Sequence, residues 1–245
     1  MTPLLCLHGF TGSPKSWDFL PASGRVSRIV PALVGHAETL ATDDVLGFED
    51  EVDRLAALSA SSARLHVVGY SLGARLALGF ALRHPARVAR LTLVSAHPGL
   101  ATEAEQSARR SSDAAWCELL EARGVAAFVE AWEMQALWAS QARLPAALRT
   151  QKQKERLSHT ALGLCRSLRV TGLAEMPNYA PALAEIDVPT DVIAGALDPK
   201  FRDLAHIFGQ NIRRARVEIV PDAGHDLLLE RPDFITEVIR RGNQT

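Results

Sequence analysis

The chain is poor in the features that mark several specialised classes of protein. Its 245 residues include only three cysteines, Cys6, Cys117 and Cys165, whose odd number and wide spacing suit neither a disulfide framework nor a zinc site. We interpret them as buried thiols. The 27 basic and 28 acidic side chains leave a formal charge of −1, so no electrostatic footprint for nucleic acid or an anionic membrane surface is expected.

Long apolar runs and a targeting segment are also absent. Apolar stretches such as Leu76 to Leu82 are far too short to span a bilayer, and the first residues, MTPLLCLHGF, lack both a basic segment and a cleavage site. We therefore expect no membrane partner and a cytoplasmic protein. No cluster has metal-ligand spacing such as HExxH, and nothing suggests a cofactor, so neither is predicted. The oligomeric state stays open between a monomer and a small homo-oligomer.

Short β-rich apolar runs alternate with segments of helical spacing along the chain. This alternation predicts the α/β class, with a mostly parallel central sheet and helices on both faces. The predicted strands are Leu4 to Leu7, Val26 to Val30, Leu65 to Val68, Leu91 to Val94, Thr190 to Ala194 and Val217 to Val220. The predicted helices around them include Glu49 to Ser59, Leu72 to Arg83, Leu204 to Phe208 and Asp233 to Arg240.

One long segment, from about residue 103 to residue 185, is helical in pattern throughout. A separate helical domain is the alternative, but no flexible Gly/Ser linker brackets the segment. We therefore predict a core of residues 1–102 and 186–245, interrupted by a helical cap of residues 103–185. Open α/β sheets bind ligands at the carboxyl ends of their strands, so a cap in that place is expected to contact substrate.

The strongest local signal is Gly69-Tyr70-Ser71-Leu72-Gly73, which lies between a predicted strand and a predicted helix. A GxSxG sequence in that context is typical of a nucleophile elbow, whose strained turn exposes the serine at the edge of the sheet. The alternative is a tight turn with an ordinary helix-capping serine. The spacing favours Ser71 as a catalytic residue.

A serine hydroxyl needs an imidazole to take its proton and a carboxylate to orient that imidazole. Asp198 and His225 each follow a predicted strand, and the order Ser71, Asp198, His225 is the one expected for an α/β-hydrolase. We predict these three as the catalytic triad. Four other acidic residues lie within a helix, ahead of a strand or too near His225 in sequence: Asp203, Asp187, Asp222 and Asp226.

The first predicted strand ends in His8-Gly9-Phe10-Thr11-Gly12. In this architecture the loop after that strand and the residue after the serine each donate a backbone N–H to an oxyanion hole. We therefore predict that Phe10 and Leu72 provide these two donors. The alternative for the first loop is a plain glycine-containing turn.

Together these residues resemble the α/β-hydrolase superfamily from about residue 4 to the C-terminus. The segments HGFTGS, GYSLGAR, SAHPGL and DPKF further resemble the 2-succinyl-6-hydroxy-2,4-cyclohexadiene-1-carboxylate synthases of menaquinone biosynthesis. This resemblance implies a lyase in which Ser71 removes a ring proton from 2-succinyl-5-enolpyruvyl-6-hydroxy-3-cyclohexene-1-carboxylate, which then expels pyruvate. The triad suits equally a serine carboxylesterase or C–C bond hydrolase acting through an acyl-enzyme. A ligand-binding protein without turnover is the third possibility.

The same resemblance implies a small anionic substrate, because guanidinium groups bind carboxylates in bidentate fashion. The matching substrate-binding positions are Tyr70, Arg75, Arg109, Trp132 and Arg156. Arg110 offers a competing register for Arg109, Arg75 could be a surface cation, and Trp132 could be cap core. His97 matches as well, with no assigned role.

The chain also departs from the family pattern in two ways. Ala74 stands where the family has a second glycine, which narrows the space beside Arg75. The antiparallel leading strands common in the superfamily are expected to be missing or vestigial. Neither departure touches the predicted triad.

Overall fold

The computed structural model describes residues 2–21, 27–36 and 44–243 of the chain. Six strands form one sheet in the order β2-β1-β3-β4-β5-β6, and every neighbouring pair is parallel. The strands are β1 Leu4–Leu7, β2 Arg28–Ile29, β3 Leu65–Tyr70, β4 Val88–Val94, β5 Thr190–Gly195 and β6 Ala215–Val220. All six predicted strands are therefore confirmed, except that Val26 lies outside the described residues. Among the described residues no antiparallel leading strand is found.

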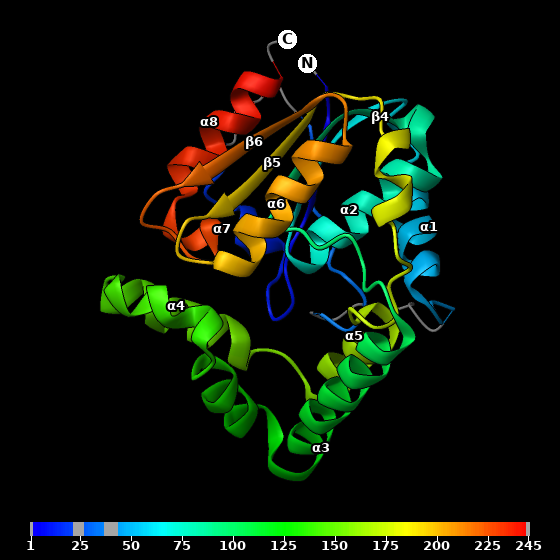
Figure 1. Ribbon diagram of the computed structural model, residues 1–245. Coiled ribbons are helices and arrows are strands. Elements are labelled where there is room, and N and C mark those ends of the chain that lie inside the picture. The colour runs from blue at the N-terminus through cyan, green and yellow to red at the C-terminus, as the bar shows by residue number, and fades with distance from the viewer. Residues whose placement is uncertain (1, 22–26, 37–43, 244–245) are drawn as a thin grey trace.

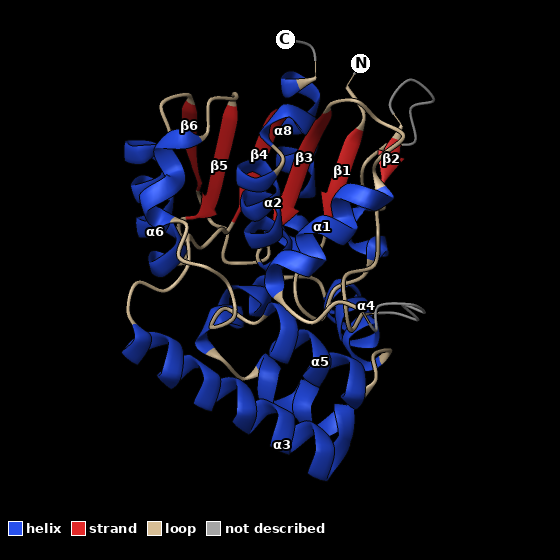
Figure 2. Cartoon of the chain, turned by 90° about the vertical axis from the view of Figure 1, so that its right-hand side faces the viewer, coloured by secondary structure: helices blue, strands red, loops and turns tan. Residues whose placement is uncertain are grey.

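Helices cover both faces of the sheet, which explains why the central strands are apolar on both sides. Figure 2 shows α1, α2 and α6 in front of the sheet and α8 behind it. The first face is covered by α1 Phe48–Leu58, α2 Leu72–Arg83 and α6 Pro199–Asn211. The second is covered by the 3₁₀ helix η1 Pro14–Trp17 and by α7 Leu227–Glu230 and α8 Pro232–Gly242. A short 3₁₀ helix, η2 Pro85–Arg87, precedes β4.

The chain between β4 and β5 forms a helical layer below the carboxyl ends of the strands (Figures 1 and 2). Its elements are α3 Glu103–Glu133, η3 Ala136–Arg143, α4 Ala146–Leu157, α5 Ala161–Thr171 and η4 Ala180–Glu185. A capping box of Thr102 with Glu105 starts α3, and Gly124 interrupts that helix at φ +75°. Apolar residues of α3, η3 and α5 form their own core. Leu173 and Leu183, after α5, pack instead into the main core.

Polar contacts fasten the helix α4 to the sheet domain. Glu155 accepts a hydrogen bond from the hydroxyl of Ser13, the N-cap of η1, at 2.5 Å. It accepts another from the hydroxyl of Ser16, within η1, at 3.0 Å. Lys152 lies 3.6 Å from Asp226, the residue after His225. The helical layer is thus tied to the core close to the predicted site. Of the helices described, none has the length and apolar character needed to cross a membrane.

Candidate active site

A sharp turn joins β3 to α2 and carries Ser71. This residue adopts φ +52° and ψ −108°, a conformation that L residues seldom occupy. A Cβ atom at Gly69 would lie 2.2 Å from the carbonyl oxygen of Gly73, and one at Gly73 would lie 2.1 Å from that of Leu7. Both positions therefore require glycine, because only a bare backbone lets the turn close against α2 and β1.

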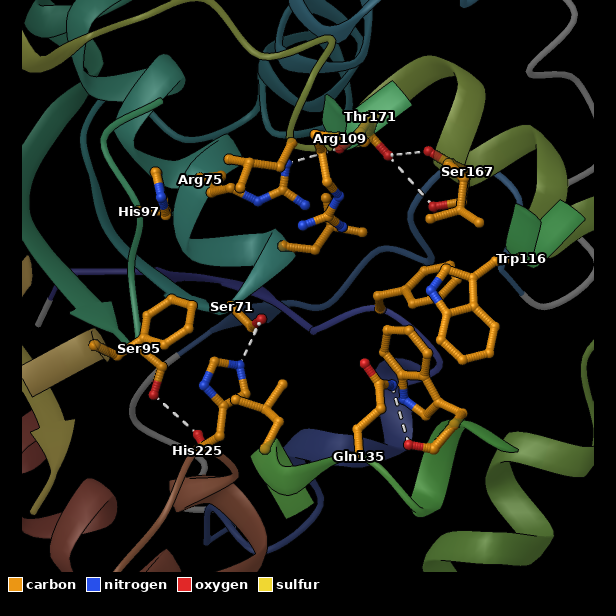
Figure 3. Close-up of a pocket in the computed structure, with 18 of the residues that line it drawn as sticks. Ser71, Arg75, Ser95, His97, Arg109, Trp116, Gln135, Ser167, Thr171 and His225 are labelled. Carbon is orange, nitrogen blue, oxygen red and sulfur yellow. Dashed lines mark hydrogen bonds between the residues drawn. The ribbon is translucent and has the colours of Figure 1, made fainter. Parts of the chain in front are cut away.

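The three residues of the predicted triad meet at the carboxyl edge of the sheet. The Oγ atom of Ser71 lies 3.0 Å from Nε2 of His225, and Nδ1 of His225 lies 2.7 Å from Oδ2 of Asp198. Figure 3 shows the first of these contacts at the edge of a pocket. His225 and Asp198 are buried, which shields their hydrogen bond from water. With Nδ1–H donated to Asp198, Nε2 is free to take the proton of Ser71.

The loop that carries His225 is held from several sides. Ser95, at the end of β4, donates its hydroxyl to the carbonyl oxygen of His225 at 2.9 Å (Figure 3). The ring of Phe201 lies 4.4 Å from the imidazole, and that of Trp138, from η3, lies 5.6 Å from it. Residues from the core and from the helical layer therefore fix the imidazole together.

Glu230, on α7, connects the His225 loop with the helical layer. One oxygen of its carboxylate accepts the Gly224 N–H at 2.8 Å, and the other accepts the hydroxyl of Ser140, on η3, at 2.9 Å. Burial raises the pKa of Glu230, and its hydrogen bonds oppose this rise. Gly224, the residue before His225, is thus anchored through Glu230 to η3 of the helical layer.

Replacement of Glu230 by leucine is expected to lower the free energy of unfolding by about 1 to 3 kcal/mol, because the Gly224 N–H loses its acceptor. We also expect a lower kcat with little change in KM, since the imidazole is misplaced while the pocket is intact. Glu230→Gln can keep both hydrogen bonds and should restore most of each loss. Urea denaturation and steady-state kinetics measure the two effects. Equal losses in both variants would contradict a role for these two bonds.

The loop after β1 brings two backbone donors to the same pocket. Phe10 and Leu72 both line it, and their N–H groups are not taken up by any other group in the part of the chain that is described. The Phe10 ring packs edge-on against Trp132 at 5.3 Å. The donors that the sequence predicts are therefore free to receive an oxyanion.

Two buried imidazoles hold this loop in place. Nε2 of His36 accepts the N–H of Thr11 at 3.1 Å, and Nε2 of His8 accepts the N–H of Leu33 at 3.2 Å. Nδ1 of each ring lies against a backbone carbonyl, that of Gly9 for His8 and that of Val34 for His36. Both rings are therefore neutral, with the proton on Nδ1. They tie the β1 loop to the segment that follows β2.

A cavity of about 230 Å³ lies between the triad and the helical layer. Figure 3 shows Arg75, Arg109 and His97 toward one end of it and Trp116 and Gln135 toward the other. The pocket thus has a cationic end and an aromatic end. Among the described residues there is no group of three or more potential metal ligands.

Arg75 carries a charge that has no carboxylate partner. Its Nη1 donates to the carbonyl oxygen of Thr171 at 2.9 Å, and no described carboxylate lies within ion-pair distance. Burial, followed by the charge of Arg109, lowers the pKa of Arg75 to about 9. The Arg75 side chain is only partly buried, and it lines the cavity. A guanidinium held in this way favours an incoming anion.

Arg109 also lines the pocket, with Nε 2.9 Å from the Asp113 carboxylate. Burial raises the pKa of Asp113, while Arg109 lowers it. Arg110, the competing register, pairs instead with Glu175 at 2.8 Å on the outside of the layer. The geometry therefore selects Arg109 over its neighbour.

The remaining predicted binding residues are divided between the pocket and its surroundings. Tyr70 and Trp132 line the cavity, and Trp132 also packs in the core of the helical layer. Arg156 does not line it. Its Nη1 donates to Glu133 at 2.7 Å, and its guanidinium lies 4.9 Å from the ring centre of Trp138. The prediction of a direct substrate contact by Arg156 is therefore not supported, because Trp138 occupies the wall in front of it.

Several pocket residues were not predicted as site residues, among them His97, Lys200 and Phe201. They follow β4 and β5, so the strand-end signal that pointed to the triad applied to them as well. Glu230 carried no such signal, because it follows a loop that only the fold brings back to η3. Ser95 directly follows β4, so the strand-end signal applied to it too, and its hydroxyl acts from a residue with φ +52°.

Comparison with known proteins gives consistent results. Residues 4–238 match a model of the alpha/beta hydrolase family. The chain is 36% identical, over 96% of its length and 88% of the relative's, to a Bacillus subtilis (strain 168) protein provisionally named as a 2-succinyl-6-hydroxy-2,4-cyclohexadiene-1-carboxylate synthase. It is 32% identical to the synthase of that name from Enterobacter sp. (strain 638), over 94% of this chain and 86% of the relative.

Solved structures give the same picture of the fold. MenH from S. aureus superimposes with a TM-score of 0.94 at 29% identity, over 100% of this chain and 95% of that one. A thermophilic esterase from Thermogutta terrifontis superimposes with a TM-score of 0.82 at 24% identity, over 100% of this chain and 90% of the other. The second likeness concerns the fold alone.

Proposed function

Because the chain belongs to the alpha/beta hydrolase family and, within it, to the 2-succinyl-6-hydroxy-2,4-cyclohexadiene-1-carboxylate synthases, we propose that it is the lyase of that reaction. Its substrate is 2-succinyl-5-enolpyruvyl-6-hydroxy-3-cyclohexene-1-carboxylate, from which it eliminates pyruvate. The reaction belongs to menaquinone biosynthesis. Ser71, His225 and Asp198 supply the base.

In this proposal Ser71 Oγ removes the proton from the ring carbon that bears the succinyl carbonyl. The serine's own proton passes to Nε2 of His225, 3.0 Å away, and Asp198 stabilises the imidazolium. The electron pair of the broken C–H bond moves into the ring, and the C–O bond to the enolpyruvyl group breaks. The leaving enolpyruvate takes up a proton and becomes pyruvate. No bond between Ser71 and the substrate is needed.

The N–H groups of Phe10 and Leu72 would stabilise the charge that develops on the succinyl carbonyl oxygen. Donors fixed in advance act strongly in a site from which water is excluded, and one such donor contributes roughly 3 kcal/mol. The buried histidines that hold the β1 loop support this role, since they keep Phe10 N–H from relaxing toward another acceptor.

The observation that carries the choice of substrate is the unbalanced positive charge of the pocket. Arg75 and Lys200 have no carboxylate within ion-pair distance in the described part of the chain, whereas Arg109 has Asp113. A substrate with several carboxylates supplies the missing negative charge. An esterase for neutral acyl esters would gain nothing from uncompensated cations in its pocket.

The helical layer would serve as the cap of this site. In our proposal the cap consists of residues 103–185. Its side chains Arg109, Trp116 and Trp132 line the pocket over the triad. We also place the reaction in the cytoplasm, since the three cysteines are unpaired and buried, as suits a reducing compartment.

The proposal is tested by an assay pair on the purified protein. With the enolpyruvyl substrate we expect rapid release of pyruvate, and with a short p-nitrophenyl ester we expect turnover at least 100-fold slower in kcat/KM. The ester matters because an activated serine beside two N–H donors can also attack a carbonyl carbon. Fast ester hydrolysis without pyruvate release would reject the lyase and favour a serine carboxylesterase or C–C bond hydrolase.

A further inference from the structure

The ring of Phe201 is the meeting point of three groups with different chemistry. The His225 ring lies 4.4 Å from it, the His97 ring 6.4 Å from it and the Lys200 ammonium 5.7 Å from its centre. His97 and Lys200 both line the pocket, His97 in the buried wall and Lys200 exposed at the mouth. These two polar groups and the catalytic imidazole therefore border the same aromatic ring.

The hydrogen bonds of His97 fix which nitrogen carries its proton. Nδ1 accepts the backbone N–H of Gly99 at 3.1 Å, so a neutral His97 must carry its proton on Nε2. Gly99 has φ +109° and packs against the backbone of Pro177, so the loop cannot easily turn this donor away. Nε2 has no hydrogen-bond partner anywhere in the residues that the structure describes. The side chain is only 8% exposed and lines the pocket, and its Nε2 is not sealed from solvent, so this unused donor is open to a ligand there.

The surroundings keep His97 uncharged. Burial is the main cause of its lowered pKa, about 3, and the positive charges of Lys200, Arg75 and Arg109 lower it further, while Glu105 opposes them. His97 therefore offers a ligand a directed, uncharged N–H donor, while Lys200 offers it a positive charge. A carboxylate can use both at once, since it offers two oxygens and accepts hydrogen bonds only.

We propose that the Nε2–H of His97 and the ammonium of Lys200 form a carboxylate subsite around the ring of Phe201, at the cationic end of the pocket. The subsite rests on the proposed function, because its ligand is one carboxylate of that anionic substrate. It specifies the orientation of the substrate, since a neutral ester group cannot balance the charge of the Lys200 ammonium.

The test measures binding without turnover, by the quenching of the pocket tryptophans Trp116, Trp132 and Trp138. One probe is 2-succinylbenzoate, an aromatic analogue that keeps the succinyl and ring carboxylates, and the other is pyruvate, the product of the leaving group. We expect His97→Phe and Lys200→Met each to raise the Kd of one probe about tenfold, as expected for loss of a hydrogen bond to a charged group. The probe that responds identifies which carboxylate is bound.

His97→Gln provides the conservative variant, because its amide can accept the Gly99 N–H and donate into the pocket. It should restore most of the lost affinity. Arg202→Met is the matched control for Lys200→Met, since Arg202 lies on the same helix, pairs with Asp203 and does not line the pocket. Lys200 is exposed, so its replacement tests the subsite even if His97→Phe weakens folding.

Unchanged Kd values for both probes in Lys200→Met and in a folded His97 variant would overturn the subsite. The outcome is separable from the fate of the proposed function. If the unaltered protein releases no pyruvate from the enolpyruvyl substrate, the lyase proposal fails while the binding result still decides the subsite.

Discussion

Replacement of Ser71 by alanine is expected to lower kcat for pyruvate release by about 10³-fold or more. The hydroxyl is the only group of the triad that reaches the substrate in the proposed mechanism, and a positioned general base contributes roughly 10² to 10⁴ in rate. Because the triad acts as a unit, neither His225 nor Asp198 can compensate for the missing oxygen. Steady-state detection of pyruvate measures the effect.

The Kd of 2-succinylbenzoate should change little in Ser71→Ala, because the cations that hold the carboxylates are intact. The midpoint of urea unfolding should change little, since alanine keeps the Cβ atom and the strained φ of +52° and gives up only the hydrogen bond with His225. Pyruvate release within tenfold of the unaltered protein would rule out Ser71 as the base.

Replacement of Arg75 by methionine is expected to reduce kcat/KM for the enolpyruvyl substrate about 10²-fold while leaving the fold as stable as before or more so. The loss follows from removing a guanidinium whose one hydrogen-bond acceptor in the described part of the chain is the Thr171 carbonyl. The gain in stability, about 1 kcal/mol, follows because a charge held against burial is replaced by an apolar chain of similar length. Kinetics and urea denaturation are measured on the same preparation.

Arg75 makes the free energy of unfolding depend on pH. The folded pKa of Arg75, about 9, lies below its unfolded value, so protonated Arg75 opposes folding at neutral pH and the penalty falls as the pH rises above about 9. Arg75→Met should therefore gain most in stability at neutral pH.

Arg83→Met is the matched control on the same helix. Arg83 pairs with Glu49 and Asp53 on the exposed side of α2, so its loss should cost at most about 1 kcal/mol and leave kcat/KM unchanged. If Arg75→Met lost equal activity toward the anionic substrate and a neutral ester, or unfolded more readily than Arg83→Met, Arg75 would be a structural residue.

The sheet and the triad could be predicted from the sequence because both follow from local patterns. The parallel topology then brings the ends of the predicted strands to one edge of the sheet. A buried strand of four to six apolar residues is recognisable by itself, and its carboxyl end must meet the ends of its parallel neighbours. Ser71, Asp198 and His225 each lay one loop beyond such a strand. Three separate local placements were therefore enough to predict one point in space.

The pocket wall opposite the triad did not follow from such signals. Arg156 lies on α4, and whether its side chain faces the cavity depends on how η3 places Trp138 in front of it. Glu230 gains its role from Ser140, which is 90 positions away and belongs to another layer. A helical period gives the buried face of a helix, and it does not give the neighbour that will cover that face.

The imidazoles that hold the β1 loop make the oxyanion donors sensitive to acid. Burial lowers the pKa of His8 to about 4 and that of His36 well below its usual value. Each ring therefore gives its full stabilisation above about pH 6.5, the value of a free imidazole, and loses it as the pH falls through the folded pKa. A protonated ring could no longer accept the N–H of Thr11 or Leu33. Acidification thus acts on catalysis through a loop that holds no member of the triad.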